Sequence, residues 1–390
     1  MLGPVTTPPR VHDVLVVGAG QAGLGTAWWL TRTGVRDVVV VDAGEVGGSW
    51  LERWDSLQLF TPRRFSRLPG LRFPAGPTPT PSRTEMAGYL RDHAARLEVP
   101  VREHTPVTRL TRDDAGFCAQ TPDGSVRARQ VVLAVGPFTR PRVPAAAQRL
   151  DPAVHQLHSS DYQLPSDVPP GPVLVVGVGN SAAQLAVELA ATHRVTVVAP
   201  HEPRFLPERR LGVSIYWWLL LSGLLNAGSD SRVARGVRRR GDAIIGRDLA
   251  RLRGEGTIGW LTGRVVGAEG SAVRLDDGRA VEVSAVLWCT GSLPETSWVD
   301  VPAALDDDGL PLHHRGASPV PGLHWMGLPW QTRVNSSIID GVDRDARRTA
   351  RRVRDALTPA GTPSRRGRRR GSRPGPGGRP PRRRSPRSGS

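Results

Sequence analysis

The 390-residue chain is long enough for two sizeable cores, and its 53 arginines against 36 acidic residues give a formal net charge of +17. It contains no lysine, which excludes a Schiff-base mechanism. Its two cysteines, Cys118 and Cys289, lie far apart in the sequence, which excludes a disulfide framework and a C-x-x-C redox pair.

A glycine-rich turn follows the first apolar run. We expect a flexible leader over 1–10, then a strand over 14–17 that runs into Gly18, Gly20 and Gly23 before an alanine- and leucine-rich helix. This is G-x-G-x-x-G in a strand–turn–helix context, which is typical of a dinucleotide site. The first glycine permits the tight turn, the second lets the backbone approach the pyrophosphate, and the third lets helix and strand pack closely.

An acidic residue ends the next apolar run. Residues 38–41 are four valines, and Asp42 follows them. In a dinucleotide site this is the expected place for an acid that hydrogen-bonds a ribose hydroxyl. Alternating strand and helix patterns continue to about Gly136 and predict a first nucleotide-binding domain.

A second glycine-rich turn repeats the pattern. The apolar run 173–176 precedes it, and a second alanine-rich helix follows. Alanine is allowed at the third position of the motif, and the polar residues of the turn can contact phosphate. The residues expected to bind a dinucleotide here are Gly177, Gly179, Asn180, Ser181 and Ala182.

The residues after the next strand favour NADP over NAD. The run 195–198 ends without an acid, so nothing at that position repels a 2′-phosphate. His201, Arg204 or Arg209 could attract that phosphate, and Arg204 is taken as the binding residue. An ordinary solvated arginine is the alternative interpretation of Arg204.

Residues 211–225 form the longest apolar stretch, and five arginines follow it at Arg232, Arg235 and 238–240. The stretch is shorter than the roughly 20 residues that span a bilayer, and no signal peptide is visible. A helix on a membrane surface and a hydrophobic lid over the substrate both fit this pattern. A buried helix or a subunit contact is favoured, so peripheral membrane contact and a homodimer both stay open.

The last third of the chain predicts a return to the first domain. A strand near 286–288 ends in a small-residue turn, and a final helix is expected over 341–357. The simplest architecture is an α/β fold of two Rossmann-like dinucleotide-binding domains, the second inserted in the first. The expected segments are a leader over 1–10, a first domain over 11–150, a second domain with its linker over 151–284, a return to the first domain over 285–357 and a tail over 358–390.

The C-terminal tail is strongly basic. Eleven arginines and no acid lie between Ser364 and Ser390, among proline, glycine and serine. Such a segment has no apolar core to bury and is expected to be disordered. It could contact RNA, DNA or an acidic lipid surface, but a solvated extension is favoured, so we expect no specific nucleic-acid partner.

Further segments resemble class B flavin-dependent monooxygenases, in particular their bacterial branch and the plant auxin-pathway enzymes. They are Gly47-Gly48-Ser49-Trp50 with the stretch after it, His158 with Tyr162, Cys289-Thr290-Gly291, and Gly327-Leu328-Pro329-Trp330 with the residues after it. The similarity covers most of 12–355. It implies that the following residues also bind a cofactor: Gly47, Gly48, Trp50, Trp54, Leu57, Val107, Thr290, Gly291, Arg333 and Asn335.

The resemblance implies FAD in the first site and NADPH in the second, with the NADP domain inserted in the FAD domain. NADPH reduces the flavin, which then adds O₂ to give a C4a-(hydro)peroxyflavin. That species oxygenates a small organic substrate at nitrogen or sulfur, or by Baeyer–Villiger insertion, as in N,N-dimethylaniline monooxygenases. Because the cofactor carries the chemistry, no catalytic side chain is assigned and no metal is expected. We expect a cytoplasmic enzyme.

Two other functions stay open. An NADPH-dependent flavin reductase or oxidase of the same fold would release hydrogen peroxide if the oxygen adduct is not stabilised. A polyanion-binding protein would act through the arginine-rich tail. Deletion of 364–390 separates that last function from the other two.

Overall fold

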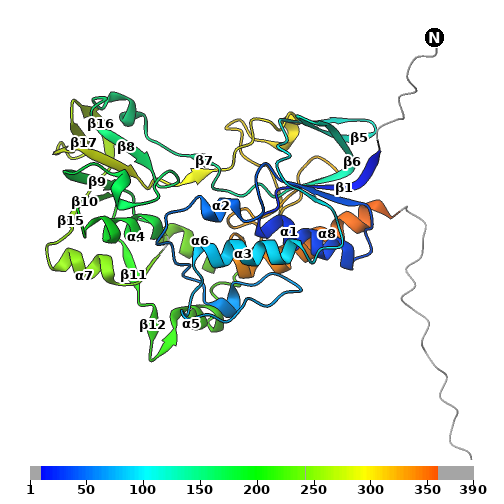
Figure 1. Cartoon of the computed structure of the whole chain (residues 1–390), viewed down its shortest axis with the longest axis horizontal. Helices are drawn as coiled ribbons and strands as arrows, with labels where there is room; N and C mark the ends of the chain where they lie inside the picture. Colours follow the sequence, from blue (N-terminus) through cyan, green and yellow to red (C-terminus); the bar gives the residue numbers. More distant parts are fainter. Residues whose placement is uncertain (1–9, 242, 359–390) are drawn as a thin grey trace, which may run out of the picture. The chain divides into compact units, whose positions relative to one another are not determined.

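The computed structural model describes residues 10–241 and 243–358, so the expected leader and tail lie almost entirely outside the described residues. Two sheets with parallel strands organise the described chain (Figure 1), and both belong to a compact unit that ends at Leu357. The α/β fold class is confirmed. None of the helices in the described ranges is long and apolar enough to cross a membrane.

The first sheet has a parallel centre and an antiparallel edge. Its strands are β1 (Val11–Val17), β2 (Val38–Val41), β3 (Val101–Arg102), β4 (Arg109–Asp113), β5 (Gly116–Thr121), β6 (Gly124–Leu133) and β21 (Leu323–Trp325). Their order is β3-β2-β1-β6-β5-β4, with β21 beside β6. β1, β2, β3, β6 and β21 pair in parallel, whereas β4, β5 and β6 pair in antiparallel fashion.

The apolar runs of this sheet are buried on both faces, as a parallel sheet covered on two sides requires. All four valines of β2 are buried. In β1, Val14 and Val16 belong to one core, and Leu15 and Val17 belong to the other. The helices that pack into the first of these cores are α1 (Gln21–Arg32), α3 (Arg83–Ala94) and α8 (Ile339–Leu357).

The second sheet is entirely parallel. Its strands are β8 (His155–His158), β9 (Pro172–Val176), β10 (Arg194–Ala199), β15 (Gly259–Thr262) and β19 (Ala285–Trp288), in the order β15-β10-β9-β19-β8. One face packs on α4 (Asn180–Leu189). The other face packs on the antiparallel strands β16 (Val265–Glu269), β17 (Ala272–Leu275) and β18 (Ala280–Glu282).

The position of β19 differs from the expected domain boundary. The sequence pattern puts the return to the first domain at residue 285, but β19 pairs with β9 and β8 inside the second sheet. All four of its residues are buried, and the sequence of a short buried strand does not indicate which sheet the strand joins. The chain rejoins the first sheet through a parallel bridge between Val299 and Leu110 of β4 and then through β21, so the second domain includes β19 up to Trp288.

Shorter elements connect the two sheets and flank them. The remaining strands are β7 (Arg140–Pro141), β11 (Arg204–Leu206), β12 (Arg209–Arg210), β13 (Val213–Ser214), β14 (Ala243–Ile245) and β20 (Ser292–Leu293). The remaining helices are α2 (Gly48–Leu51), α5 (Ile215–Leu221), α6 (Arg232–Arg240) and α7 (Asp248–Gly254). Short 3₁₀ turns within the described ranges cover Arg63–Phe65, Ala145–Arg149, Pro165–Asp167 and Pro302–Ala304.

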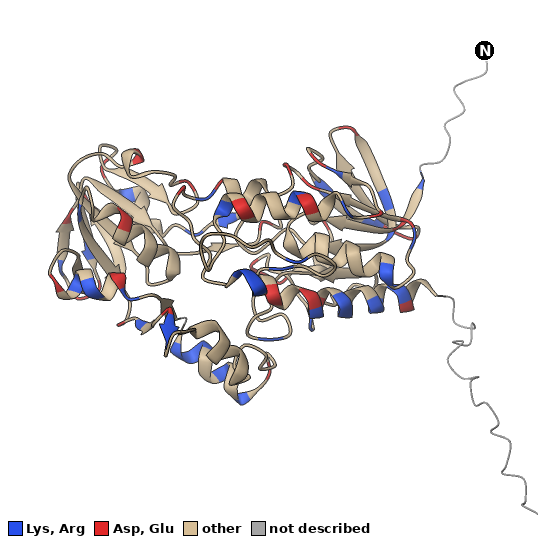
Figure 2. Cartoon of the chain, turned by 60° about the horizontal axis from the view of Figure 1, so that its bottom comes forward, with Lys and Arg blue, Asp and Glu red and all other residues tan. Residues whose placement is uncertain are grey.

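A buried polar link ties α8 to the first sheet. Gln130 on β6 donates from Nε2 to the Val353 carbonyl (3.1 Å), and its Oε1 lies 3.0 Å from Nε2 of His324 on β21. Both Gln130 and His324 are buried. Figure 2 shows charged residues along the visible side of α8, so this link lies opposite a solvated helix face.

His324 makes the stability of this link depend on pH. Burial lowers the pKa of His324 from 6.5 to about 4, and the charge of Arg352 acts in the same direction. Between these values the unfolded chain binds a proton that the folded chain does not, so the free energy of unfolding falls as pH falls. When the pH falls from about 7.5 to 4.5, we expect the free energy of unfolding of His324→Gln to decrease by about 2 kcal/mol less than that of wild type. Denaturant unfolding at the two pH values measures this, and equal losses would contradict it.

Candidate functional site

The first glycine turn joins β1 to α1 and leaves room only in front of the helix. Gly18 has φ +105°, and a Cβ there would lie 2.4 Å from the Ala134 carbonyl oxygen. A Cβ on Gly23 would lie 1.8 Å from the Gly18 oxygen. A Cβ on Gly20 would meet nothing within 4 Å, and no side chain caps the helix that starts beside it. The free N–H groups of α1 therefore fit the diphosphate of a dinucleotide.

Asp42 links this turn to the loop that follows β2. Its Oδ2 accepts from the Ala19 amide (2.5 Å) and its Oδ1 accepts from the Gly44 amide (2.9 Å). Asp42 thus lies beside the open turn, where the sequence predicts a ribose contact. That contact stays a prediction.

The second glycine turn repeats this geometry between β9 and α4. Gly177 has φ +140°, and a Cβ there would lie 2.2 Å from the Cys289 carbonyl oxygen. A Cβ on Gly179 would meet nothing within 4 Å, and α4 also starts without a side-chain cap. Ala182 is buried in the core beneath the turn, while Ser181 is partly exposed at its front. This turn fits a second dinucleotide.

The Asn180 side chain bonds to β14, and its contact with phosphate stays a prediction. Its Oδ1 accepts from the Ile245 amide (2.9 Å), and its Nδ2 donates to the Ala243 carbonyl (3.4 Å). Both ends of the amide are therefore engaged with β14. Because β14 pairs with β11, Asn180 ties the strand that carries Arg204 to the second glycine turn.

Arg204 is exposed beside this turn. Its guanidinium donates to the Gly241 carbonyl (2.8 Å) and forms no ion pair with any residue that the structure describes. An exposed guanidinium with spare N–H groups can bind a phosphate. Its position is compatible with the 2′-phosphate contact that the sequence predicts.

The cofactor-binding residues that the resemblance implies near α2 divide between the two domains. Gly47 has φ +84°, and a Cβ there would lie 2.7 Å from the Ala87 oxygen on α3, so the start of α2 at Gly48 approaches α3 closely. Trp50 packs against the first core and Val107 packs against the opposite face of the same sheet. The two that lie elsewhere, against the core of the second sheet, are Trp54 and Leu57.

Thr290 and Gly291 lie where the chain leaves the second sheet. The Thr290 hydroxyl donates to the Arg142 carbonyl, and the Gly291 carbonyl accepts from the Arg142 amide (3.0 Å). His158 Nε2 also lies 3.0 Å from the Gly291 oxygen, and burial lowers the pKa of His158. These contacts hold the two connections between the domains together.

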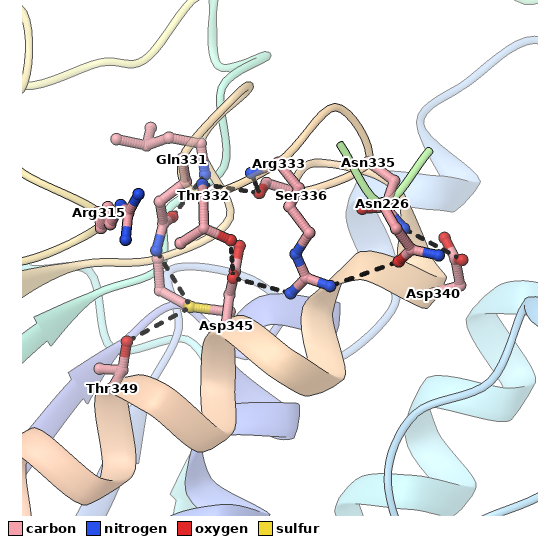
Figure 3. Close-up of polar contacts among 12 residues, drawn as sticks. Asn226, Arg315, Gln331, Thr332, Arg333, Asn335, Ser336, Asp340, Asp345 and Thr349 are labelled. Carbon is pink, nitrogen blue, oxygen red and sulfur yellow. Dashed lines mark hydrogen bonds and ion pairs between the residues drawn. The ribbon is translucent and has the colours of Figure 1, made fainter. Parts of the chain in front are cut away.

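Arg333 is held in a buried ion pair with α8, as Figure 3 shows. Its guanidinium lies 3.5 Å from Asp345, whose side chain is only 1% exposed. The Thr332 hydroxyl donates to the same carboxylate, and Arg333 also donates to Asn226 (3.5 Å). Burial lowers the pKa of Arg333, and Asp345 acts in the opposite direction.

Asn335 lies in the turn before α8, close to the same network. Its Nδ2 donates to Asp340 (3.2 Å), a carboxyl whose pKa is raised by burial and lowered by Tyr216 and by Asn335 itself. Asn335 is therefore committed to Asp340 through its amide nitrogen. Its Oδ1 is buried without a hydrogen-bond partner among the described residues.

The loop after α5 docks on this segment through its backbone. The amide of Ser229 donates to the Thr332 carbonyl (2.9 Å), and the amide of Asn335 donates to the Leu225 carbonyl (3.2 Å). The inserted domain is thus bonded to the segment that carries Arg333. The sequence analysis assigned no role to Asn226, Asp340 or Asp345.

The sequence around Asp345 contains a signal for its burial. It falls among the positions of α8 that repeat at three- and four-residue spacing and face the core, with Val342, Ala346 and Thr349. An acid on such a stripe needs a buried partner. No comparable local signal identifies Asn226.

Comparisons with known proteins match the chain over most of its length. A family model described as pyridine nucleotide-disulphide oxidoreductase matches residues 15–219. An uncharacterized oxidoreductase CzcO-like from Geobacillus kaustophilus is 40% identical over 86% of this chain and 97% of its own. The indole-3-pyruvate monooxygenase YUCCA1 of Oryza sativa is 28% identical over 81% and 84%. A solved flavin-containing monooxygenase from Stenotrophomonas maltophilia is 27% identical, with a TM-score of 0.75 over 90% of this chain and all of that one.

The chain therefore belongs to the pyridine nucleotide-disulphide oxidoreductase family, within a flavin-dependent monooxygenase family of that fold. The resemblance predicted from sequence is confirmed, as is the flavoprotein monooxygenase class. Flavin monooxygenases of this family use FAD and NADPH, the two cofactors that were expected. Which residues of this chain bind them stays a prediction.

This chain lacks the pair of cysteines that the disulphide chemistry in the family's name requires. The chain has only Cys118 and Cys289, and both are free thiols on different sheets. Burial raises the pKa of Cys289 to about 12, so its thiol stays protonated near neutral pH. A buried thiol without a second cysteine cannot cycle through an intramolecular disulfide.

The two open glycines allow a matched test of the sites. Neither Gly20→Ala nor Gly179→Ala meets protein atoms, so both variants are expected to fold with the wild-type melting temperature. Each added methyl group would occupy the space of a diphosphate. We expect Gly20→Ala to weaken FAD binding by about tenfold or more, and Gly179→Ala to weaken only NADPH binding by a similar factor.

Flavin content after purification and titration with NADPH read out the two effects, and each variant is the control for the other. Loss of both ligands in one variant, or of neither in both, would contradict the assignment of one cofactor to each turn.

Proposed function

We propose that this protein is an NADPH-dependent flavin monooxygenase that binds FAD at the β1–α1 turn and NADPH at the β9–α4 turn. The observation that carries the proposal is the pair of open helix starts, at Gly20 and Gly179, within one chain. A chain with two dinucleotide sites can pass electrons from one cofactor to the other. Membership of a flavin monooxygenase family supports the same direction of electron flow.

The residues of this chain bind and orient the cofactors in this account. The N–H groups of α1 bind the FAD diphosphate and Asp42 orients the ribose. The N–H groups of α4 bind the NADPH diphosphate, and Arg204 contacts the 2′-phosphate. Arg333, paired with Asp345, fixes the segment before α8, and this segment is proposed to close over the flavin and the nicotinamide.

The bound cofactor supplies the oxygen chemistry. When bound and reduced, FAD would supply a C4a-(hydro)peroxyflavin from O₂, and this would give one oxygen atom to nitrogen or sulfur, or insert it beside a ketone. The other oxygen atom leaves as water, and NADPH supplies the two electrons. The protein would hold the flavin where water is excluded, and no side chain is assigned as an acid or base.

Oxygen half-reaction kinetics test this function. Enzyme reduced with NADPH without oxygen is mixed with O₂ while the flavin spectrum is followed. Without substrate we expect a C4a adduct that persists for seconds before it decays to oxidised flavin and peroxide. With a substrate of the amine, sulfide or ketone class, we expect little peroxide. Direct return to oxidised flavin, with one peroxide per NADPH even across such a substrate panel, would instead identify a reductase or oxidase.

Arg204 is expected to set the preference for NADPH over NADH. Removing its charge removes one phosphate contact that is worth about 1.5–3 kcal/mol. We expect Arg204→Gln to raise the KM for NADPH by about tenfold or more, with the KM for NADH unchanged. Arg274→Gln, which removes an exposed guanidinium from β17, is the matched control. Equal effects on NADPH and NADH would refute this role for Arg204.

A further inference from the structure

A hairpin and a short helix in the inserted domain expose a group of apolar side chains. Leu211 is 85% exposed at the tip of the β12–β13 hairpin, and Leu221 is 76% exposed at the end of α5. Val213 and Trp218 are also exposed. We call these four residues the α5 surface. The sequence favoured a buried helix or a subunit contact here, but within α5 only Ile215 and Tyr216 are buried.

The α5 surface is continuous because the hairpin and the helix contact each other. Trp218 Nε1 donates to the Arg210 carbonyl (3.3 Å), and the Arg210 guanidinium lies 6.0 Å from the centre of the Trp218 ring. Leu221 follows Trp218 by nearly one helical turn and Leu211 follows Arg210 directly, so the exposed side chains are neighbours. Figure 1 shows β12 and α5 together at one edge of the protein.

The opposite side of α5 is anchored to the protein. The ring of Phe65 lies 4.9 Å from that of Tyr216 and 4.7 Å from that of Trp217, and both Ile215 and Tyr216 are buried. The Arg209 guanidinium also donates to the Gly212 carbonyl (3.0 Å by Nε), which closes the hairpin tip. The exposed leucines are therefore presented by an anchored element.

Positive charge borders the α5 surface. Arg64 stacks on Trp217 at 5.3 Å, and Arg209 and Arg210 lie in the hairpin. None of the three forms an ion pair with another described residue, and residues 209–229 contain no acid. Farther along, α6 adds five arginines and no acid. Apolar side chains that protrude among unpaired cations are complementary to an anionic lipid surface.

We propose that the α5 surface docks the protein on an anionic lipid membrane. Leu211, Trp218 and Leu221 enter the boundary between headgroups and acyl chains, while the arginines contact lipid phosphates. With seven residues α5 is too short to cross a bilayer, so it lies in the interface. A symmetric contact between two copies is disfavoured because it would oppose like-charged arginines across an interface.

Vesicle flotation of the full-length protein tests this proposal. Vesicles of phosphatidylcholine with about one third phosphatidylglycerol are compared with vesicles of phosphatidylcholine alone. The variant Leu211→Asp/Leu221→Asp is compared with Val143→Asp/Val266→Asp, which makes two similar changes at exposed residues elsewhere. Every protein keeps the arginine-rich segment after residue 363, so its charge contribution is the same in each. Melting temperature and flavin content establish that the variants fold.

We expect wild type and the control variant to bind the anionic vesicles, and the leucine variant to bind at least about tenfold more weakly. Lipids brominated near the carbonyl end of the acyl chain should quench wild-type fluorescence more than that of Trp218→Phe. Equal binding by the leucine variant would overturn the proposal in favour of the arginine-rich segment. Absence of wild-type binding, or a dimer that the leucine variant dissociates, would overturn it in favour of a free surface or a contact between copies.

Discussion

The structure depends on two glycines, Gly23 in α1 and Gly177 before α4. At each of them only a hydrogen atom fits between the chain and a neighbouring backbone carbonyl. A side chain on Gly23 would overlap the Gly18 carbonyl, and one on Gly177 would overlap the Cys289 carbonyl. Gly18 directly follows β1 and Cys289 directly follows β19, and both strands are buried in their sheets, so these carbonyls cannot move away. The same close packing leaves Gly20 and Gly179 free in front of α1 and α4, so the tightest contacts of the fold create its two open sites.

A second constraint fixes the inserted domain to the first one. The loop after α5 bonds through its backbone to the segment at 332–335, and the buried pair of Arg333 and Asp345 holds that segment on α8. Breaking a buried pair leaves an uncompensated charge, so this contact resists separation. In the proposed function the two cofactors exchange electrons, and the pair would help to keep their two domains in one arrangement.

Sequence reasoning found the features that main-chain geometry imposes locally. The glycine turns and the buried strands before them have signatures a few residues long, and these predicted the two-domain α/β fold. The placement of 285–288 was missed because pairing between β19 and β9 joins segments more than a hundred residues apart. The bond between the Asn180 side chain and β14 was missed for a similar reason, since its partner is the backbone of a distant strand that no pattern around Asn180 predicts.

The central claim is that one chain holds both an oxidisable and a reducible dinucleotide. The most direct measurement is anaerobic titration of the purified flavoprotein with NADPH, followed by the absorbance of the oxidised flavin. The account predicts complete bleaching with one equivalent of NADPH per bound FAD. A protein that purifies without FAD and does not take it up, or a bound flavin that NADPH and NADH both leave oxidised, would contradict it.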